Sequence, residues 1–296
     1  MAHKSGFINI VGHPNVGKST LMNALVGERM SIITNKPQTT RHRIIGLVSG
    51  DDFQMVFSDT PGMIKEPGYK MQERMNSFVR GTFEDADIMM LVIDITERFD
   101  PDSPLFSSLE KVKCPLFLVL NKVDLVSIEK QAKSILEWTA RIKFTEIFPL
   151  SALTGLNVKL LLEKLLDHLP EGPEYYPKDQ FSDRPERFFV SEIIREKILM
   201  QYYQEIPYSC EVVVDAFKED VEKDLVTIHA TIYAERPTQK SIIIGKGGSS
   251  IKQLGIDSRK AIQSFLDKRV YLELFVKIKE DWRDDEQLLK MFGYDD

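Results

Sequence analysis

The first part of the chain alternates between short apolar runs and longer segments whose apolar residues recur at helical spacing. Apolar runs at residues 7–11, 53–57, 116–120 and 147–150 predict buried strands of a parallel sheet. Segments 19–25 and 158–169 have the spacing of helices that cover such a sheet. Residues 44–49 and 53–58, joined by Gly50, Asp51 and Asp52, predict one antiparallel hairpin. The order of elements predicts an α/β fold, a mostly parallel sheet with helices on both faces.

The pattern changes after a proline-rich stretch with prolines at positions 170, 173, 177 and 185. Proline cannot continue a helix and favours an extended, fairly stiff connector. Beyond it, helical spacing over 188–204 is followed by strand-like runs at 210–217 and 225–235. A glycine-rich loop, a helix over 249–266 and a strand over 270–278 complete an α+β unit. We therefore predict two domains, 1–170 and 187–296, joined by a linker at 171–186.

Composition adds limits rather than a function. The chain has 296 residues, is 43% apolar and 28% charged, and has the length for two ordinary globular domains. Its two cysteines, Cys114 and Cys210, are far apart and predict a reducing compartment. The first predicted strand begins by residue 7 and leaves no room for a signal peptide. Because no apolar stretch approaches the roughly 20 residues that span a bilayer, we expect any membrane contact to be peripheral.

The loop after the first strand carries the complete pattern G-x-x-x-x-G-K-[ST]. Such a loop turns backbone N–H groups inward at a helix N-terminus, where they can surround the phosphates of a nucleotide. Lys18 is expected to reach the β- and γ-phosphates, and the Ser19 hydroxyl to bind Mg²⁺. The predicted nucleotide-binding residues here are Gly12, His13, Pro14, Asn15, Val16, Gly17, Lys18, Ser19 and Thr20.

A second motif, Asn121-Lys122-Val123-Asp124, follows another predicted strand and selects the base. Guanine presents two neighbouring N–H donors that one carboxylate, here Asp124, can accept. Lys122 can lay its stem over the base. Asn121 has two open roles, a hydrogen bond toward N7 of the base or a tie between this loop and the phosphate loop. A site that satisfies the polar edge of one base rejects an analogue lacking that edge, so we predict GTP and GDP rather than ATP.

Three further segments belong to the same site. Asp59, Thr60, Pro61 and Gly62 follow a strand, so that Asp59 can hold Mg²⁺ and the Gly62 N–H can meet the γ-phosphate. Thr40, in a loop, is a candidate metal ligand, and Ser151, Ala152 and Leu153 can cover the guanine edge. The predicted metal ligands are Ser19, Thr40 and Asp59. The predicted catalytic residues are Lys18, Thr40, Asp59 and Gly62.

These motifs together resemble the translation-factor-related GTPases, and more narrowly the bacterial Era family. The resemblance rests on the following segments: GHPNVGKS at 12–19, QTTRHR at 38–43, DTPG at 59–62, NKVD at 121–124, SAL at 151–153 and IGKGG at 244–248. It implies a C-terminal type II KH domain and a short helix over 240–244, although Ile242, Ile243 and Ile244 look strand-like. It also implies a monomer in the cytoplasm that binds 16S ribosomal RNA near its 3′ end, acts in 30S subunit assembly and has a possible weak peripheral membrane contact.

Charge distribution supports an RNA partner in the second domain. The whole chain has a net charge of −6, yet residues 236–279 carry +7 and residues 280–296 carry −5, an acidic tail. In KH domains a G-x-x-G loop clamps the backbone of about four nucleotides. Clustered lysines and arginines beside such a loop indicate a nucleic-acid surface. The predicted RNA-binding residues are Gly245, Lys246, Gly247, Gly248, Lys240 and Lys252.

The sequence also bears on the rate of hydrolysis. Met63 follows Gly62 where Ras has the glutamine that orients the attacking water, so slow intrinsic turnover is expected. Related GTPases use an asparagine at the position of Asn15 to hold K⁺, which suggests K⁺ stimulation. Segments 33–43 and 62–80 are the expected switches. The alternative is an RNA-binding scaffold whose nucleotide site is structural, although the intact Lys18, Ser19 and Asp59 favour an enzyme.

Overall fold

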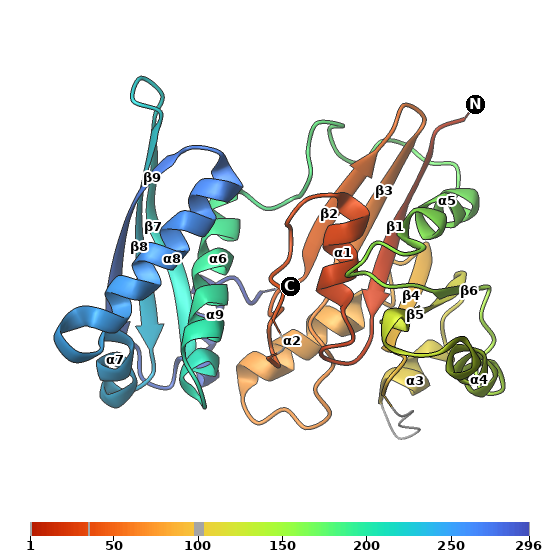
Figure 1. The fold of residues 1–296 in the computed structure, drawn as a ribbon, viewed down its shortest axis with the longest axis horizontal. Coiled ribbons are helices and arrows are strands. Elements are labelled where there is room, and N and C mark those ends of the chain that lie inside the picture. The colour runs from red at the N-terminus through yellow and green to blue at the C-terminus, as the bar shows by residue number, and fades with distance from the viewer. Residues whose placement is uncertain (1, 35, 98–103, 296) are drawn as a thin grey trace.

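A computed structural model describes residues 2–34, 36–97 and 104–295, and it places two domains side by side (Figure 1). The six-stranded sheet of the first domain has the order β2-β3-β1-β4-β5-β6. Strand β2 is antiparallel to β3 and the other neighbouring pairs are parallel, so the predicted α/β class and hairpin are confirmed. The strands are β1 Lys4–Val11, β2 Ile44–Ser49, β3 Phe53–Asp59, β4 Ile88–Asp94, β5 Leu116–Asn121 and β6 Glu146–Pro149.

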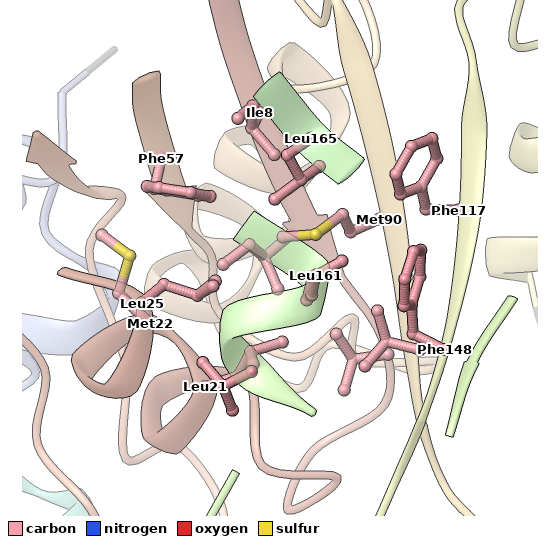
Figure 2. Close-up of a cluster of buried hydrophobic side chains, with 14 of the residues drawn as sticks. Ile8, Leu21, Met22, Leu25, Phe57, Met90, Phe117, Phe148, Leu161 and Leu165 are labelled. Atoms are coloured by element: carbon pink, nitrogen blue, oxygen red, sulfur yellow. The ribbon is translucent and has the colours of Figure 1, made fainter. Parts of the chain in front are cut away.

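Helices cover both faces of this sheet, because successive strand residues point to opposite sides and both sets are apolar. Figure 2 shows one face, where Leu21 of α1 and Leu161 of α5 pack against Ile8, Met90 and Phe117 of the strands. The other face packs against α3 and α4. The helices are α1 Lys18–Val26, α2 Lys70–Gly81, α3 Pro104–Leu109, α4 Ile128–Thr139 and α5 Val158–His168.

The second domain has a three-stranded sheet in the order β7-β8-β9, with β8 antiparallel to β7 and parallel to β9. Its elements are α6 Glu186–Gln201, β7 Cys210–Asp220, β8 Leu225–Ala234, α7 Pro237–Ile244, α8 Ser249–Leu266, β9 Arg269–Ile278 and α9 Glu286–Met291. The strand-like isoleucines at 242–244 lie in helix α7. The helix starts at Pro237, and the Gln239 side chain accepts the N–H groups of Glu235 and Arg236. A proline at the first position and a capped N-terminus thus outweigh the β-branched run.

The segment between α5 and α6 lies against β2 and β3 of the first domain. The Gln54 side chain accepts the N–H groups of Tyr175 and Tyr176 at 2.8 and 2.9 Å. The Ser182 hydroxyl donates to the Ile45 carbonyl at 2.6 Å. Helix α6 then begins at Glu186, the last residue of the predicted linker and one residue before the predicted start of the second domain. None of the helices in the described ranges has the length and apolar character needed to cross a membrane.

The acidic C-terminal segment is folded against the first domain. Trp282 and Tyr294 are completely buried, and they pack in one cluster with Met71 and Met75 of α2. Its acidic side chains pair across the interface, as when Glu286 contacts Arg74 at 2.7 Å. The segment therefore joins the second domain to α2, which lies in the predicted second switch.

Candidate nucleotide site and RNA interface

The carboxyl ends of the parallel strands meet at one edge of the first domain, as expected for a ligand site in this kind of sheet. A cleft of about 420 Å³ opens there, between the phosphate loop and the loops that follow α1 and β3. Its lining includes Asn15, Lys18, Ser19, Thr20, Thr40, Gly62, Met63 and Lys122. Residues from four separate sequence motifs thus surround one space. Residue 35, within the predicted first switch, lies outside the described residues.

Asn121 ties the base-selecting loop to its neighbours. Its side-chain NH₂ donates to the Val16 carbonyl at 2.8 Å, and its oxygen accepts the Ala152 N–H at 2.9 Å. A side chain at Gly17, whose φ is 98°, would place its Cβ 2.2 Å from the Asn121 Nδ2. Glycine is therefore needed there for both backbone conformation and contact. Of the two roles that the sequence leaves open for Asn121, this structure shows the tie between loops.

Lys18 is buried at the base of the cleft. Its ammonium donates to the carbonyls of Gly12 and His13 at 3.0 and 2.9 Å. Burial lowers the pKa of Lys18 to about 8, and the nearby Asp59 carboxylate opposes the shift only in part. Phosphate oxygens in the cleft would favour the charged form and offset this cost of burial.

Ser19, Thr40 and Asp59 form a compact group of oxygen atoms. The Ser19 hydroxyl donates to Asp59 Oδ2 at 2.8 Å and lies 2.9 Å from the Thr40 hydroxyl. Burial raises the pKa of Asp59, although Lys18 and hydrogen bonds from Ser19 and Thr40 oppose the shift. Among the described residues, none donates a hydrogen bond to the buried Asp59 Oδ1. A carboxylate with an unused oxygen beside two hydroxyls fits a hard cation such as Mg²⁺.

Other predicted residues shape the loops around the cleft. The Thr60 hydroxyl donates to the Ile10 carbonyl of β1 at 2.9 Å, so it fixes the loop. A Cβ at Gly62 would lie 2.9 Å from the Pro14 nitrogen, which leaves room for glycine alone beside the phosphate loop. Val16, Pro61, Ser151 and Ala152 are buried, His13 is half-buried with its ring 6.1 Å from that of Phe106, and Asp124 and Leu153 are exposed.

Asp94 is part of this site and was not predicted from the sequence. Its Oδ2 accepts from Lys122 at 2.6 Å, and its Oδ1 accepts from the backbone and hydroxyl of Thr96. Burial tends to raise the pKa of Asp94, but the hydrogen bonds from Lys122 and Thr96 outweigh it and hold the pKa below its usual range. Lys122 also donates to the Asn15 carbonyl at 2.9 Å. Asp94 is the last residue of β4, and that strand-end position was the available signal.

In the second domain, the loop Gly245-Lys246-Gly247-Gly248 connects α7 to α8. Lys246 and Lys252 are exposed, and Lys240 is half-buried. Ile242 on α7, with 51% of its surface exposed, adds an apolar surface near the loop that charge counting does not reveal. The loop thus combines exposed backbone, positive charge and an apolar neighbour, which together suit a single-stranded nucleic acid.

The fold and these motifs define a P-loop GTPase joined to a KH domain. A family model described as a 50S ribosome-binding GTPase matches residues 7–122, and a KH domain model matches residues 205–283. The chain is 46% identical over 294 residues to GTPase Era of Syntrophus aciditrophicus (strain SB), covering 99% of this chain and 96% of that one. The chain therefore belongs to the Era family of GTPases.

Solved structures agree with this assignment over the full length. A Tyr-to-Ala variant of Aquifex aeolicus Era bound to GDP·AlF₄⁻ is 36% identical with a TM-score of 0.93, covering 98% of this chain and 99% of that one. An Era in complex with MgGDPNP and nucleotides 1506–1542 of 16S ribosomal RNA has the same identity and TM-score, with 99% of each chain covered.

The contact between Asp94 and Lys122 leads to a prediction about nucleotide affinity. Asp94→Asn should weaken binding of GTP and of GDP by the same factor, about tenfold, because it removes a charge-assisted hydrogen bond on the base side of the cleft. Isothermal titration calorimetry with both nucleotides measures this. Asp87→Asn, just before the amino end of β4, is the matched control and should bind like the wild type. Affinities of Asp94→Asn within twofold of wild type would contradict the assignment.

Proposed function

We propose that the protein is a GTP-hydrolysing switch that binds small-subunit ribosomal RNA through its KH domain and acts in assembly of the 30S subunit. The observation that carries this proposal is the group of Ser19, Thr40 and Asp59 beside Lys18, in a chain that also carries the GKGG loop. The Era complex with MgGDPNP and 16S ribosomal RNA supports it, because that relative resembles this chain along its whole length.

In this proposal, residues 1–170 form the GTPase domain, residues 171–186 the linker and residues 187–296 the RNA-binding domain. Lys18 and the N–H groups of residues 12–20 hold the phosphates, and Asp124 accepts the guanine N–H groups. Ser19, Thr40 and Asp59 hold Mg²⁺, which neutralises charge on the phosphate oxygens when it is bound. Gly62 presents its N–H to the γ-phosphate. Met63 packs against the apolar cluster on the α3–α4 face and has no group to orient water, so intrinsic turnover is slow.

The remaining parts of the proposal concern the cell. The RNA partner places the protein in the cytoplasm, where it acts as a monomer. Contact with the inner face of the membrane is, in this proposal, weak and peripheral. The GKGG loop, Lys240 and Lys252 contact the RNA near the 3′ end of the small-subunit ribosomal RNA.

Lys18→Ala tests the enzyme against the scaffold alternative. The substitution removes the buried cation from the phosphate loop, and GTP turnover should fall by at least about 100-fold, as for loss of one preorganised donor at a transition state. Release of phosphate from GTP measures it. Lys133→Ala, on the exposed face of α4, is the control and should retain full turnover. A wild-type protein that binds GTP but shows no turnover above Lys18→Ala would favour the structural-site alternative.

Asn15 leads to a prediction about monovalent cations. Asn15 lines the phosphate cleft, and a cation held there would add positive charge where the transferred phosphoryl group develops negative charge. Turnover should therefore be faster in KCl than in NaCl at equal ionic strength, and Asn15→Ala should abolish the difference. Equal turnover of the wild type in the two salts would remove K⁺ from the proposal.

Gly247→Asp tests the RNA site. A Cβ at Gly247 meets no atom within 4 Å, and its backbone is left-handed, with φ 60° and ψ 23°, a conformation that aspartate adopts at a modest cost. The protein should therefore fold, while the new carboxylate would repel the RNA backbone. Affinity for an RNA that carries the 3′ end of the small-subunit ribosomal RNA should fall by at least about tenfold at fixed salt. Gly27→Asp, which is equally open but lies in the first domain, is the control.

The same RNA titration of the wild type with a GTP analogue, with GDP and without nucleotide tests the coupling of the domains. Three equal RNA affinities would contradict coupling.

A further inference from the structure

The loop that carries Thr40 is held in place by the second domain. The Lys36 ammonium donates to the Tyr202 carbonyl at 2.6 Å, at the end of α6. On the other side of Thr40, the Arg41 guanidinium is fully buried and donates to the carbonyls of Pro207 and Cys210 at 3.0 and 2.8 Å. The predicted metal ligand thus lies between two side chains that are anchored outside its own domain.

Arg195 of α6 makes the most direct contact with this loop. It is 1% exposed, and its Nε and Nη2 donate to the two oxygens of Glu192, each at 2.7 Å. The same guanidinium donates to the carbonyl of Gln38, at 3.4 Å, and to the carbonyl of Thr39. Burial tends to raise the pKa of Glu192, but its pairing with Arg195 outweighs it and holds the pKa below its usual range. The arginine is therefore held rigidly while it binds the loop.

The contact with Thr39 bears on the orientation of Thr40. The peptide group is planar, so fixing the Thr39 carbonyl also fixes the direction of the Thr40 N–H and Cα. The Thr40 hydroxyl then lies 2.9 Å from Ser19 Oγ and 3.5 Å from Asp59 Oδ2. In the described part of the chain, the side-chain hydrogen bonds of Ser19 and Asp59 all come from the first domain. Thr40 is in addition linked to α6 through the peptide that joins it to Thr39.

We propose that Arg195 is a positioning residue for the GTPase site, through which the KH domain sets the place of the magnesium ligand Thr40. The inference rests on the proposed function, in which Ser19, Thr40 and Asp59 bind Mg²⁺ with GTP. Mg²⁺ demands near-ideal octahedral geometry, so a displaced ligand weakens the site. The effect belongs to the triphosphate state, because the γ-phosphate and Mg²⁺ order this switch in GTPases and GDP does not.

Arg195→Lys is the first test. Lysine keeps the charge but cannot bind Glu192 through two N–H groups and also reach the Thr39 carbonyl, because it lacks the planar fork. The ratio of GDPNP affinity to GDP affinity should fall about tenfold, which corresponds to ~1.4 kcal/mol. The Mg²⁺ concentration for half-maximal GDPNP binding should rise. Calorimetric titration of each nucleotide over a series of Mg²⁺ concentrations measures both without any turnover.

Arg29→Lys is the matched control. Arg29 also pairs with a glutamate of α6, Glu196, across the same interface, but Arg29 follows α1 and is not part of the loop at 38–40. Its affinity ratio and Mg²⁺ requirement should equal those of the wild type. If Arg195 only held the domains together, Arg195→Lys would lower the Tm, while the affinity ratio and the Mg²⁺ requirement would stay at wild-type values. That result would overturn the proposal.

A double variant, Glu192→Leu with Arg195→Met, covers the case in which Arg195→Lys does not fold. Replacing both partners of a buried ion pair with apolar residues of similar size leaves no unpaired charge and is often tolerated. The same fall in affinity ratio is expected, and a wild-type ratio would overturn the inference. A wild-type protein that binds neither nucleotide would instead contradict the proposed function, so the two failures are distinguishable.

Discussion

The burial of one cation, Arg41, ties the loop before β2 to the start of β7 and so helps to fix the relative placement of the two domains. Its guanidinium is fully buried and meets the carbonyls of Pro207, Tyr208 and Cys210 and the carboxylate of Glu211. A buried charge is stable only while it is paired, and removing its partners costs several kcal/mol. The loop that carries Arg41 and the start of β7 can therefore separate only if Arg41 loses all of these partners at once. Tyr294, which donates to Glu211 at 2.7 Å, joins the C-terminal segment to the same network.

The nucleotide site also contains buried charged groups. Lys18 and Asp59 are both buried, and the pKa of each is shifted toward the neutral form by burial. A site that holds its charges in this unfavourable state gains when an anion and a divalent cation enter it. The cost of burying these groups is met during folding, so the ligand meets an arrangement that is already assembled.

Motifs that act within a few residues could be predicted from the sequence, because a turn and its neighbouring strand are local. The phosphate loop at 12–19 follows β1, and Asp59 and Asn121 end β3 and β5, all strands whose apolar runs are plain in the sequence. Contacts between distant residues could not be predicted in the same way. Arg195 lies 156 positions from Thr39, and spacing along the chain carries no sign of such a pair.

The C-terminal segment and helix α7 show two further limits of the sequence. Composition at 280–296 indicates only an acidic tail, whereas the burial of Trp282 and Tyr294 folds it onto α2. At 242–244, β-branched residues favour a strand, but Pro237 and Gln239 at the start of α7 stabilise a helix instead. In both places a few specific contacts determine the structure, and neither the acidic composition of 280–296 nor the strand propensity of 242–244 indicates them.

The contact of Ser182 with β2 sets how far the second domain can travel. Helix α6 starts at Glu186, four residues after this anchor, so the fully extended chain spans at most about 14 Å between them. If the interface around Arg41 opens, the KH domain can pivot on this short tether but cannot drift away. Its effective concentration near the GTPase domain stays in the millimolar range that short tethers give. Closure is then an intramolecular step, and its equilibrium does not depend on how much protein the cell contains.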